Sequence, residues 1–503
     1  MNKIAIIDIN STKISLLINE YLPSGNYTVI EDLSEPVRIV EDYDGEGLLR
    51  ASRSAEAMSI IKMYKVICEV NEVEDIVIYA SSSIKNLKNY RSFVDEIYNS
   101  IGLKVKILSE EEENVSLYMG IANSIDIAKG VAVSISGSST KLVQYNRRNI
   151  LNQTTIPVGT HQMSQLLENS SDTQSGCEAI TEAFKKELSQ VEWLKEIDAE
   201  FKLIGTGNAF YNVATLSRKL RKYPLDLVHN YNLTKSHFDN VYNLLKTLEI
   251  DKNKKIKGVS SDRADIFAGG VCMIKAIMET ANFEDCTISN KGIKDGQMLS
   301  IIAPFTNEKP LADMLGFSLD NCVAFYDKDE SHVKHVGDLA LILFKQLKVL
   351  HKLSRNYVKI LRIASLLHNS GRRISFYDNE KNSFAIILGS DVYGCTHREL
   401  VLSAFVASCQ NINNFNLAEW IKYKDLFEEE DLEAMRKLAI IVKLANCLDK
   451  TKRKSVQDIS CDILGDSVIM KTIVTQDASI EIKEAIKYAQ DFKKVYKKSL
   501  EVL

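Results

Sequence analysis

The sequence has few of the residues that break up or cross-link a chain. Its 503 residues include only six prolines, and its nine cysteines are scattered from Cys68 to Cys461 without a CxxC pair. The few prolines and the lack of a low-complexity linker predict domains that pack closely. The odd number of scattered cysteines fits reduced thiols, so we expect a cytoplasmic protein without a disulfide framework.

Long apolar runs and a strong excess of one charge are also missing. The first apolar stretch is short, Asp8 interrupts it and no small-residue cleavage site follows, so we expect no signal peptide. No run approaches the ~18 apolar residues that span a bilayer, so we expect no membrane association. The formal net charge of −4 does not favour nucleic acid as a partner. A small polyanion would need only a local positive groove.

The sequence does contain a strand and helix pattern that occurs twice. Short β-branched runs at 3–9 and 13–18 predict a hairpin, which is followed by a helix at 54–70, strands at 75–80 and 104–108 and a helix at 111–123. The pattern then restarts with strands at 130–136 and 141–145, helices near 160–168 and 175–195, and a strand–turn–helix unit at 201–216. This repetition predicts an α/β fold with a duplicated topology.

From about residue 330 helical spacing dominates. We expect helices at 332–353, 355–370, 396–411 and 431–449, and a small sheet at about 460–482. We place the domain break between 302 and 330. The predicted domains are therefore a first lobe at 1–124, a second lobe at 125–302 and a helical domain at 325–503.

Three turns of small polar residues follow predicted strands, at 8–12, 134–140 and 205–208. Such turns expose backbone N–H groups and hydroxyls that can bind phosphate oxygens. One turn of this kind is most often only a turn. Two turns at matching places in similar halves would face each other across a cleft, as the phosphate-binding turns of actin-like folds do.

A longer series of segments points to one family. They lie at 8–13, 80–85, 108–114, 134–141, 157–159, 205–207, 223–231, 263–266 and 292–296. In this order and spacing they resemble the exopolyphosphatase / guanosine pentaphosphate phosphohydrolase (Ppx/GppA) family. Residues 330–450 resemble the HD-type helical domain of its long members, with His332, His368 and Asn369, and the segment 444–449, at its histidine and aspartate positions.

The resemblance implies a duplicated actin-like (ribonuclease H-like) fold, an HD-type domain and a homodimer. It also implies Mg²⁺-assisted hydrolysis of the terminal phosphate of inorganic polyphosphate or guanosine pentaphosphate. Glu113 matches the catalytic glutamate, although four consecutive glutamates also suit a solvated helix start. Asp8 remains as a weak metal ligand. The implied phosphate-binding residues are Ser11, Thr12, Lys85, Gly137, Ser138, Ser139, Thr140, Lys141, Gly205 and Gly207.

Several positions depart from the family pattern. Ser134 replaces an aspartate and Lys141 a glutamate that are expected near the metal, which shifts the formal charge of that site by +3. Lys85 replaces an arginine, and residues other than glycine stand at 10, 136, 138 and 208. Asn369 and Asn446 replace aspartates of the HD-type site.

The eroded HD-type site changes what we expect of the histidines. His368 has apolar flanks, so we expect a buried, hydrogen-bonded core histidine instead of a metal ligand. His332 and His335 lie one helical turn apart, and we expect them at a helix surface or a domain seam.

Several functions remain open at this point. The first is a phosphoanhydride hydrolase, with full or impaired activity. The second is a protein that binds polyphosphate or guanosine polyphosphate without efficient turnover, with Lys13, Lys85 and Lys141 supplying the charge of the missing metal. An actin-like sugar or acetate kinase ranks lower, because the segment around Glu113 and the helical domain match the hydrolases. A purely structural role would leave the phosphate turns unexplained.

Overall fold

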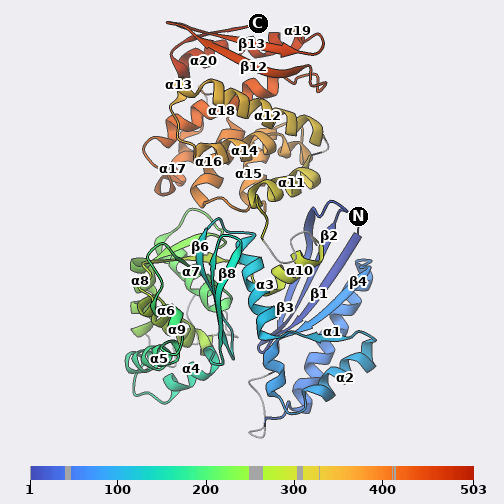
Figure 1. Ribbon diagram of the computed structural model, residues 1–503, viewed down its shortest axis with the longest axis vertical. Helices are drawn as coiled ribbons and strands as arrows, with labels where there is room; N and C mark the ends of the chain where they lie inside the picture. Colours follow the sequence, from blue (N-terminus) through green and yellow to red (C-terminus); the bar gives the residue numbers. More distant parts are fainter. Residues whose placement is uncertain are drawn as a thin grey trace. The chain divides into compact units, whose positions relative to one another are not determined.

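The computed structural model describes residues 2–39, 47–247, 264–302, 310–327, 329–409, 412 and 415–503. The chain forms two compact units, an N-terminal unit (Met1–Ala312) and a C-terminal unit (Asp313–Leu503). Figure 1 shows their elements coloured along the sequence. Within the described residues, no helix combines the length and apolar character needed to cross a membrane.

The first sheet of the N-terminal unit has five strands. They are β1 (Asn2–Ile9), β2 (Lys13–Tyr21), β3 (Tyr27–Pro36), β4 (Asp75–Ala80) and β5 (Val105–Ile107), in the order β3-β2-β1-β4-β5. Strands β1, β2 and β3 are antiparallel, whereas β4 and β5 run parallel to β1. Helices α1 (Ala51–Val70) and α2 (Tyr90–Ile101) pack on one face of this sheet through a shared apolar core.

The second sheet has six strands in the order β10-β11-β9-β6-β7-β8. They are β6 (Lys129–Ile135), β7 (Thr140–Asn146), β8 (Asn149–Ile156), β9 (Lys202–Thr206), β10 (Tyr231–Thr234) and β11 (Asp285–Ser289). Again a three-stranded antiparallel meander continues into parallel strands beside its first strand. The duplicated topology predicted from the sequence is therefore confirmed. The helices of this lobe are α4 (Thr160–Glu168), α5 (Thr173–Leu188), α6 (Glu192–Lys195), α7 (Asn208–Arg221), α8 (Lys235–Lys246) and α9 (Ala264–Thr280).

Two helices connect the sheets. Helix α3 (Glu110–Ala122) packs on β6, β7 and β8, and α10 (Ile293–Ile302) contacts both α3 and β1. The two helices approach so closely that a Cβ on Gly120 would lie 2.2 Å from the Gly292 carbonyl oxygen. A Cβ on Gly296 would lie 1.9 Å from the Ser116 carbonyl oxygen. These glycines therefore fix the position of α3 relative to the first sheet.

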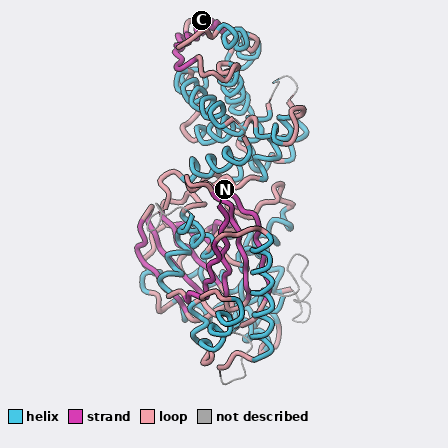
Figure 2. The backbone as a smooth tube through the Cα atoms, turned by 90° about the vertical axis from the view of Figure 1, so that its right-hand side faces the viewer, coloured by secondary structure: helices cyan, strands magenta, loops and turns pink. Residues whose placement is uncertain are grey.

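The C-terminal unit is mostly helical, as Figure 2 shows in cyan. Its helices are α11 (Met314–Tyr326), α12 (Glu330–Gln346), α13 (Lys348–His351), α14 (Tyr357–Leu367), α15 (Asn379–Gly389), α16 (His397–Ser408), α17 (Leu417–Lys422), α18 (Asp431–Cys447), α19 (Ser479–Ile486) and α20 (Ala489–Tyr496). A small sheet of β12 (Val456–Ile463), β13 (Ser467–Val474) and β14 (Ser499–Val502) completes it.

Some predicted boundaries were wrong for local reasons. The helix predicted over 175–195 ends at Leu188, because the Ser189 hydroxyl donates to the carbonyl of Lys186 and competes with the helical ladder. The helix predicted over 332–353 breaks at Leu347 into α12 and α13. The segment 263–266 lies partly outside the described residues, since Arg263 is not among them.

The contact between α3 and α10 gives a first prediction. Gly296→Ala forces a methyl group against the Ser116 carbonyl, so we expect a loss of about 1–3 kcal/mol in the free energy of unfolding. Urea denaturation measures it. Gly389→Ala is the control, because its Cβ would meet nothing within 4 Å. Equal stability of the two variants would contradict the close helix contact.

Candidate functional site

The predicted phosphate turns come together in one cleft of the N-terminal unit, with a volume of about 300 Å³. Its lining comes from the β1–β2 turn, the first turn of α3, the β6–β7 turn, the β9–α7 turn and the loop that leads into α10. Strands β1, β6 and β9 all end at this cleft. Ligands of open α/β sheets bind at such carboxyl ends of strands.

A buried ion pair forms one wall of the cleft. The Lys141 Nζ atom lies 3.2 Å from Oε2 of Glu113, with side chains only 6% and 2% exposed. The Ser82 hydroxyl donates to the same carboxylate oxygen over 2.6 Å. Lys141 also donates to the Ser139 hydroxyl over 3.4 Å. Glu113 is therefore held in place by a cation and a hydroxyl, and Lys141 joins it to the β6–β7 turn.

Local structure explains how Glu113 reaches the cleft. Ser109 caps α3: its hydroxyl accepts from the Glu112 N–H, and the Glu112 carboxylate accepts from the Ser109 N–H. This capping box fixes the start of the helix. Glu110, Glu111 and Glu112 remain at least partly exposed, whereas Glu113 turns inward and is 1% exposed. The alternative interpretation of the four glutamates, a helix start that faces solvent, therefore holds for Glu110, Glu111 and Glu112 but not for Glu113.

Two turns present polar groups from the second sheet. The Ser136 hydroxyl accepts from the Ser139 N–H over 3.1 Å, which keeps the β6–β7 turn tight. Gly207 has a φ of 90° and precedes α7, so the N-terminus of this helix opens on the cleft. A positive φ favours glycine, and a helix N-terminus favours anions.

Asp8 lies at the end of β1 and also lines the cleft. Burial raises the pKa of this carboxyl to about 6, although the positive charges of Lys13 and Lys294 act in the opposite direction. The Asn10 side-chain amide donates a hydrogen bond to it. The amide therefore competes with a metal for one oxygen of this carboxylate.

The structure separates the predicted site residues into two groups. The cleft is lined by Asp8, Thr12, Glu113, Ser139, Lys141 and Gly207. The others do not line it: Ser11, Lys85, Gly137, Ser138, Thr140 and Gly205.

The predicted site residues that do not line the cleft are exposed, buried or packed elsewhere in the lobe. Lys85 is exposed on the short 3-10 helix Ser82–Asn86, and Ser11 is buried. The Thr140 hydroxyl donates to the Val158 carbonyl, and a Cβ on Gly205 would lie 2.1 Å from the Phe210 ring. Gly137 lines a smaller adjoining pocket of about 30 Å³.

Sequence reasoning missed several residues that line the cleft. Lys294 and Asp295 belong to the segment 292–296, which had been matched only as a motif. Asp32 lies on β3, a strand that was not predicted, and forms an ion pair with Lys294. Tyr211 of α7 is 47% exposed at the cleft. Ser82, which donates to Glu113 without lining the cleft itself, could have been suspected from the segment 80–85.

The residues present do not fit a divalent metal. Ser134 and Lys141, which face each other as partners in β6 and β7, bring a hydroxyl and an ammonium to the cleft instead of carboxylates. Glu113 already pairs with Lys141, and Asp8 accepts from Asn10. Over the described ranges, no group of three or more His, Cys, Asp or Glu side chains is placed to hold a metal ion.

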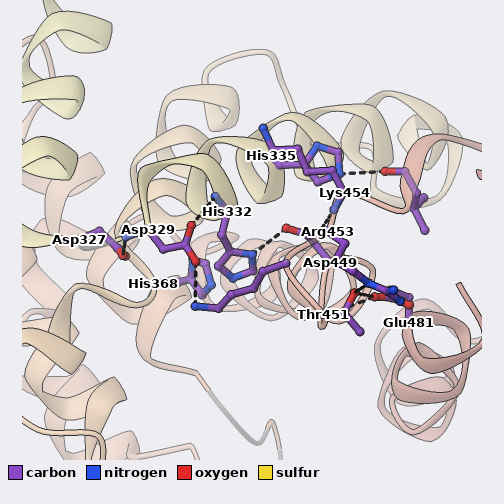
Figure 3. Close-up of polar contacts among 12 residues, drawn as sticks. Asp327, Asp329, His332, His335, His368, Asp449, Thr451, Arg453, Lys454 and Glu481 are labelled. Carbon is purple, nitrogen blue, oxygen red and sulfur yellow. Dashed lines mark hydrogen bonds and ion pairs between the residues drawn. The ribbon is translucent and has the colours of Figure 1, made fainter. Parts of the chain in front are cut away.

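The C-terminal unit contains a second polar cluster, shown in Figure 3. His332 Nδ1 lies 2.7 Å from Oδ2 of Asp449, whose other oxygen accepts from the Lys454 N–H over 2.8 Å. His335 Nε2 donates to the carbonyl of Val456 over 2.8 Å. Both histidines are buried, so of the two positions expected for them, a helix surface or a domain seam, the helix surface was wrong. Helix α12 lies against α14, α18 and β12, which cover these residues.

His368 is buried near this cluster, as the sequence predicted. Its Nδ1 donates to the Ser365 carbonyl over 2.7 Å, and burial lowers its pKa to about 4. It lines a pocket of about 50 Å³ together with Asn369 and Asn446. Amides are poor ligands for hard cations, so this pocket is a polar interior and not an open metal centre.

Sequence comparison now identifies the family. The sequence pattern of the Ppx/GppA phosphatase family matches residues 22–305, and the pattern of its domain III matches residues 317–485. The chain belongs to the Ppx/GppA phosphatase family. A guanosine-5'-triphosphate,3'-diphosphate pyrophosphatase of Aeromonas salmonicida is 21% identical over 463 residues, which cover 89% of this chain and 88% of that protein. A bifunctional 3-dehydroquinate synthase/phosphatase of Fusobacterium nucleatum is 24% identical over 55% of this chain and 43% of its own.

Solved structures show the same fold for part of the chain. The Ppx/GppA family member of Aquifex aeolicus matches with a TM-score of 0.53 and 22% identity, and covers 60% of this chain and 98% of its own. An exopolyphosphatase of Cytophaga hutchinsonii matches with a TM-score of 0.55 and 17% identity, with the same coverage. At such identities the likeness concerns the fold and not the active-site chemistry.

The raised pKa of Asp8 predicts a pH-dependent stability. Between its usual pKa of 3.8 and the folded value of about 6, the folded protein binds more protons, so stability falls as the pH rises through this window. The difference corresponds to on the order of 2–3 kcal/mol at pH 7.5. We therefore expect Asp8→Asn, with EDTA present, to raise the free energy of unfolding at pH 7.5 and to change it little at pH 4.

The exposed Asp75, on the neighbouring strand β4, provides the matched control. Asp75→Asn should leave the difference between the two pH values as in the wild type. If Asp8→Asn lowered stability at pH 7.5, the buried carboxylate would be a stabilising group and its assignment here would be wrong.

Proposed function

We propose that the cleft binds the end of a phosphoanhydride chain, inorganic polyphosphate or a guanosine polyphosphate, and hydrolyses its terminal phosphate. One observation supports this above the others: the Glu113 carboxylate is buried at the cleft, oriented by Ser82 and Lys141, beside two turns built to accept phosphate. A fixed carboxylate next to an anion site is the arrangement that water attack on phosphorus requires.

Each group has a defined role in this reaction. The N-terminus of α7 and the Ser136–Ser139 turn hold phosphoryl oxygens, while Lys13 adds positive charge. Glu113 accepts a proton from water as the water oxygen bonds to the terminal phosphorus. The bond from that phosphorus to the bridging oxygen breaks, and the bridging oxygen keeps the electron pair on the shortened chain. Glu113 then returns its proton to solvent.

The names of similar proteins support this class of substrate. The Aeromonas salmonicida relative is named for a guanosine polyphosphate, and the Cytophaga hutchinsonii structure for polyphosphate. Both ligands end in a chain of phosphoanhydrides, so the same cleft chemistry serves either one. The residues that line the cleft do not distinguish inorganic polyphosphate from a guanosine polyphosphate.

A second candidate is binding without efficient turnover. Oε2 of Glu113 already contacts the Lys141 ammonium and the Ser82 hydroxyl, so this oxygen is engaged before any water arrives. This observation favours a regulatory or binding protein on the same scaffold.

The C-terminal unit fits an HD-type architecture in our proposal. His332, His368, Asn369 and Asn446 stand where an HD-type site would bring ligands together, and the first three are buried in the same unit. In this chain they would serve packing and hydrogen bonding. A homodimer, which the family resemblance implies, and a cytoplasmic location, which the scattered cysteines favour, remain part of the proposal.

Phosphate release tests the proposed function. Wild-type protein would be incubated with long-chain polyphosphate or guanosine pentaphosphate, with and without Mg²⁺, beside Glu113→Gln. We expect Glu113→Gln to lower the rate by about 10²–10⁴-fold, because it removes the base and keeps the shape. Lys129→Met, at the far end of β6 where Lys129 is half-buried and pairs with Glu200, should leave the rate unchanged. Release that survives Glu113→Gln would exclude Glu113 as the base.

If neither substrate releases phosphate in the wild type, a thermal shift separates the two candidates. A higher melting temperature with either ligand would favour binding without turnover. No release and no shift under any condition would contradict both.

A further inference from the structure

The buried ammonium group of Lys141 lies at the cleft and forms an ion pair with Glu113. Lys141 is in β7, and its side chain is 6% exposed although the cleft opens beside it. Its neighbours are the Glu113 carboxylate at 3.2 Å and the Ser139 hydroxyl at 3.4 Å. An ammonium has three N–H donors, so these two neighbours leave one for a ligand oxygen.

The other charged residues of the cleft are largely paired among themselves. Lys294 pairs with Asp32, and Asp295 pairs with Lys291. Lys13 acts electrostatically on Asp8. Among the residues that the structure describes, the lining contains three lysines and four carboxylates, which gives no surplus of positive charge for a polyanion. A positively charged group that attracts the ligand must therefore become unpaired when the ligand binds or reacts.

The ion pair provides such a source. While Glu113 is ionised, it neutralises Lys141. When Glu113 accepts a proton from the attacking water, the ammonium loses its counter-charge at the same moment that negative charge develops on the leaving oxygen. In a water-poor site an unpaired ammonium interacts strongly with such an oxygen.

We propose that Lys141 is the phosphoryl-binding cation of this cleft and that it takes the place of a divalent metal ion, so that the ligand is bound without one. The inference rests on the proposed function, because it names the positively charged residue that binds the phosphoryl group in the same cleft. Ser134, the β-sheet partner of Lys141, supplies a neutral hydroxyl where a second carboxylate would attract a metal. A metal carried in by the ligand would be repelled by the ammonium.

Binding is best measured in a background without turnover. Glu113→Gln would be compared with the double variant Glu113→Gln/Lys141→Met, with inorganic tripolyphosphate as the probe in isothermal titration calorimetry. Glu113→Gln leaves the Lys141 ammonium without its carboxylate partner and therefore ready for the ligand, whereas the double variant replaces the ion pair with two neutral side chains of similar volume. We expect the double variant to bind about ten- to a hundredfold more weakly, as for the loss of one charge-assisted hydrogen bond.

The same titration in EDTA and in Mg²⁺ tests the metal. We expect Glu113→Gln to bind tripolyphosphate in EDTA at least as tightly as in Mg²⁺. Glu113→Gln/Lys141→Arg should retain most of the affinity, and Glu113→Gln/Lys129→Met is the control for loss of a lysine elsewhere. Urea denaturation of each variant establishes that it is folded.

The outcomes separate this inference from the proposed function. Binding or phosphate release that requires Mg²⁺, or equal affinity with and without Lys141, overturns the inference and leaves the proposed function standing. If wild-type protein neither binds nor hydrolyses tripolyphosphate, polyphosphate or guanosine pentaphosphate under any condition, the proposed function fails and the inference fails with it.

Discussion

The ion pair between Lys141 and Glu113 is the constraint on which the site depends. Removing two charges from water costs several kcal/mol for each, and only close contact and further hydrogen bonds offset this cost. Ser82 and Ser139 supply those hydrogen bonds. The two partners come from α3 and β7, so both elements must be held within a fraction of an ångström. The glycine contact between α3 and α10 and the capping box at Ser109 serve this requirement.

The same pair decides what the cleft can do. A carboxylate beside an anion site suits water attack on phosphorus. The Lys141 ammonium at this position disfavours a divalent metal ion, because the two positive charges repel each other. Membership of the Ppx/GppA phosphatase family therefore explains the fold and the placement of the turns. In the proposal made above, Ser134 and Lys141 replace carboxylates that would attract a metal, and the ligand is bound without one.

The sequence predicted the duplicated topology well, because β1 and β6 are short apolar runs, buried along most of their length, that each end in a turn of small polar residues. It missed β3, whose polar and mostly exposed residues carry no clear alternation. Lys141 and Glu113 were each identified from motifs, but no sequence pattern shows that they touch, since that contact depends on how α3 packs across the sheet. Lys85 matched a motif and yet lies exposed outside the cleft. The buried contacts of His332 and His335 likewise depend on Asp449 and Val456, which come far later in the chain.

The most direct test of this account is a crystal structure of Glu113→Gln grown with tripolyphosphate and Mn²⁺, with anomalous scattering used to locate the metal. The account predicts a phosphoryl oxygen about 2.7–2.9 Å from Lys141 Nζ and no manganese in the cleft. A manganese ion bound by Asp8 and bridging to the phosphate, with the Lys141 side chain turned away, would contradict it.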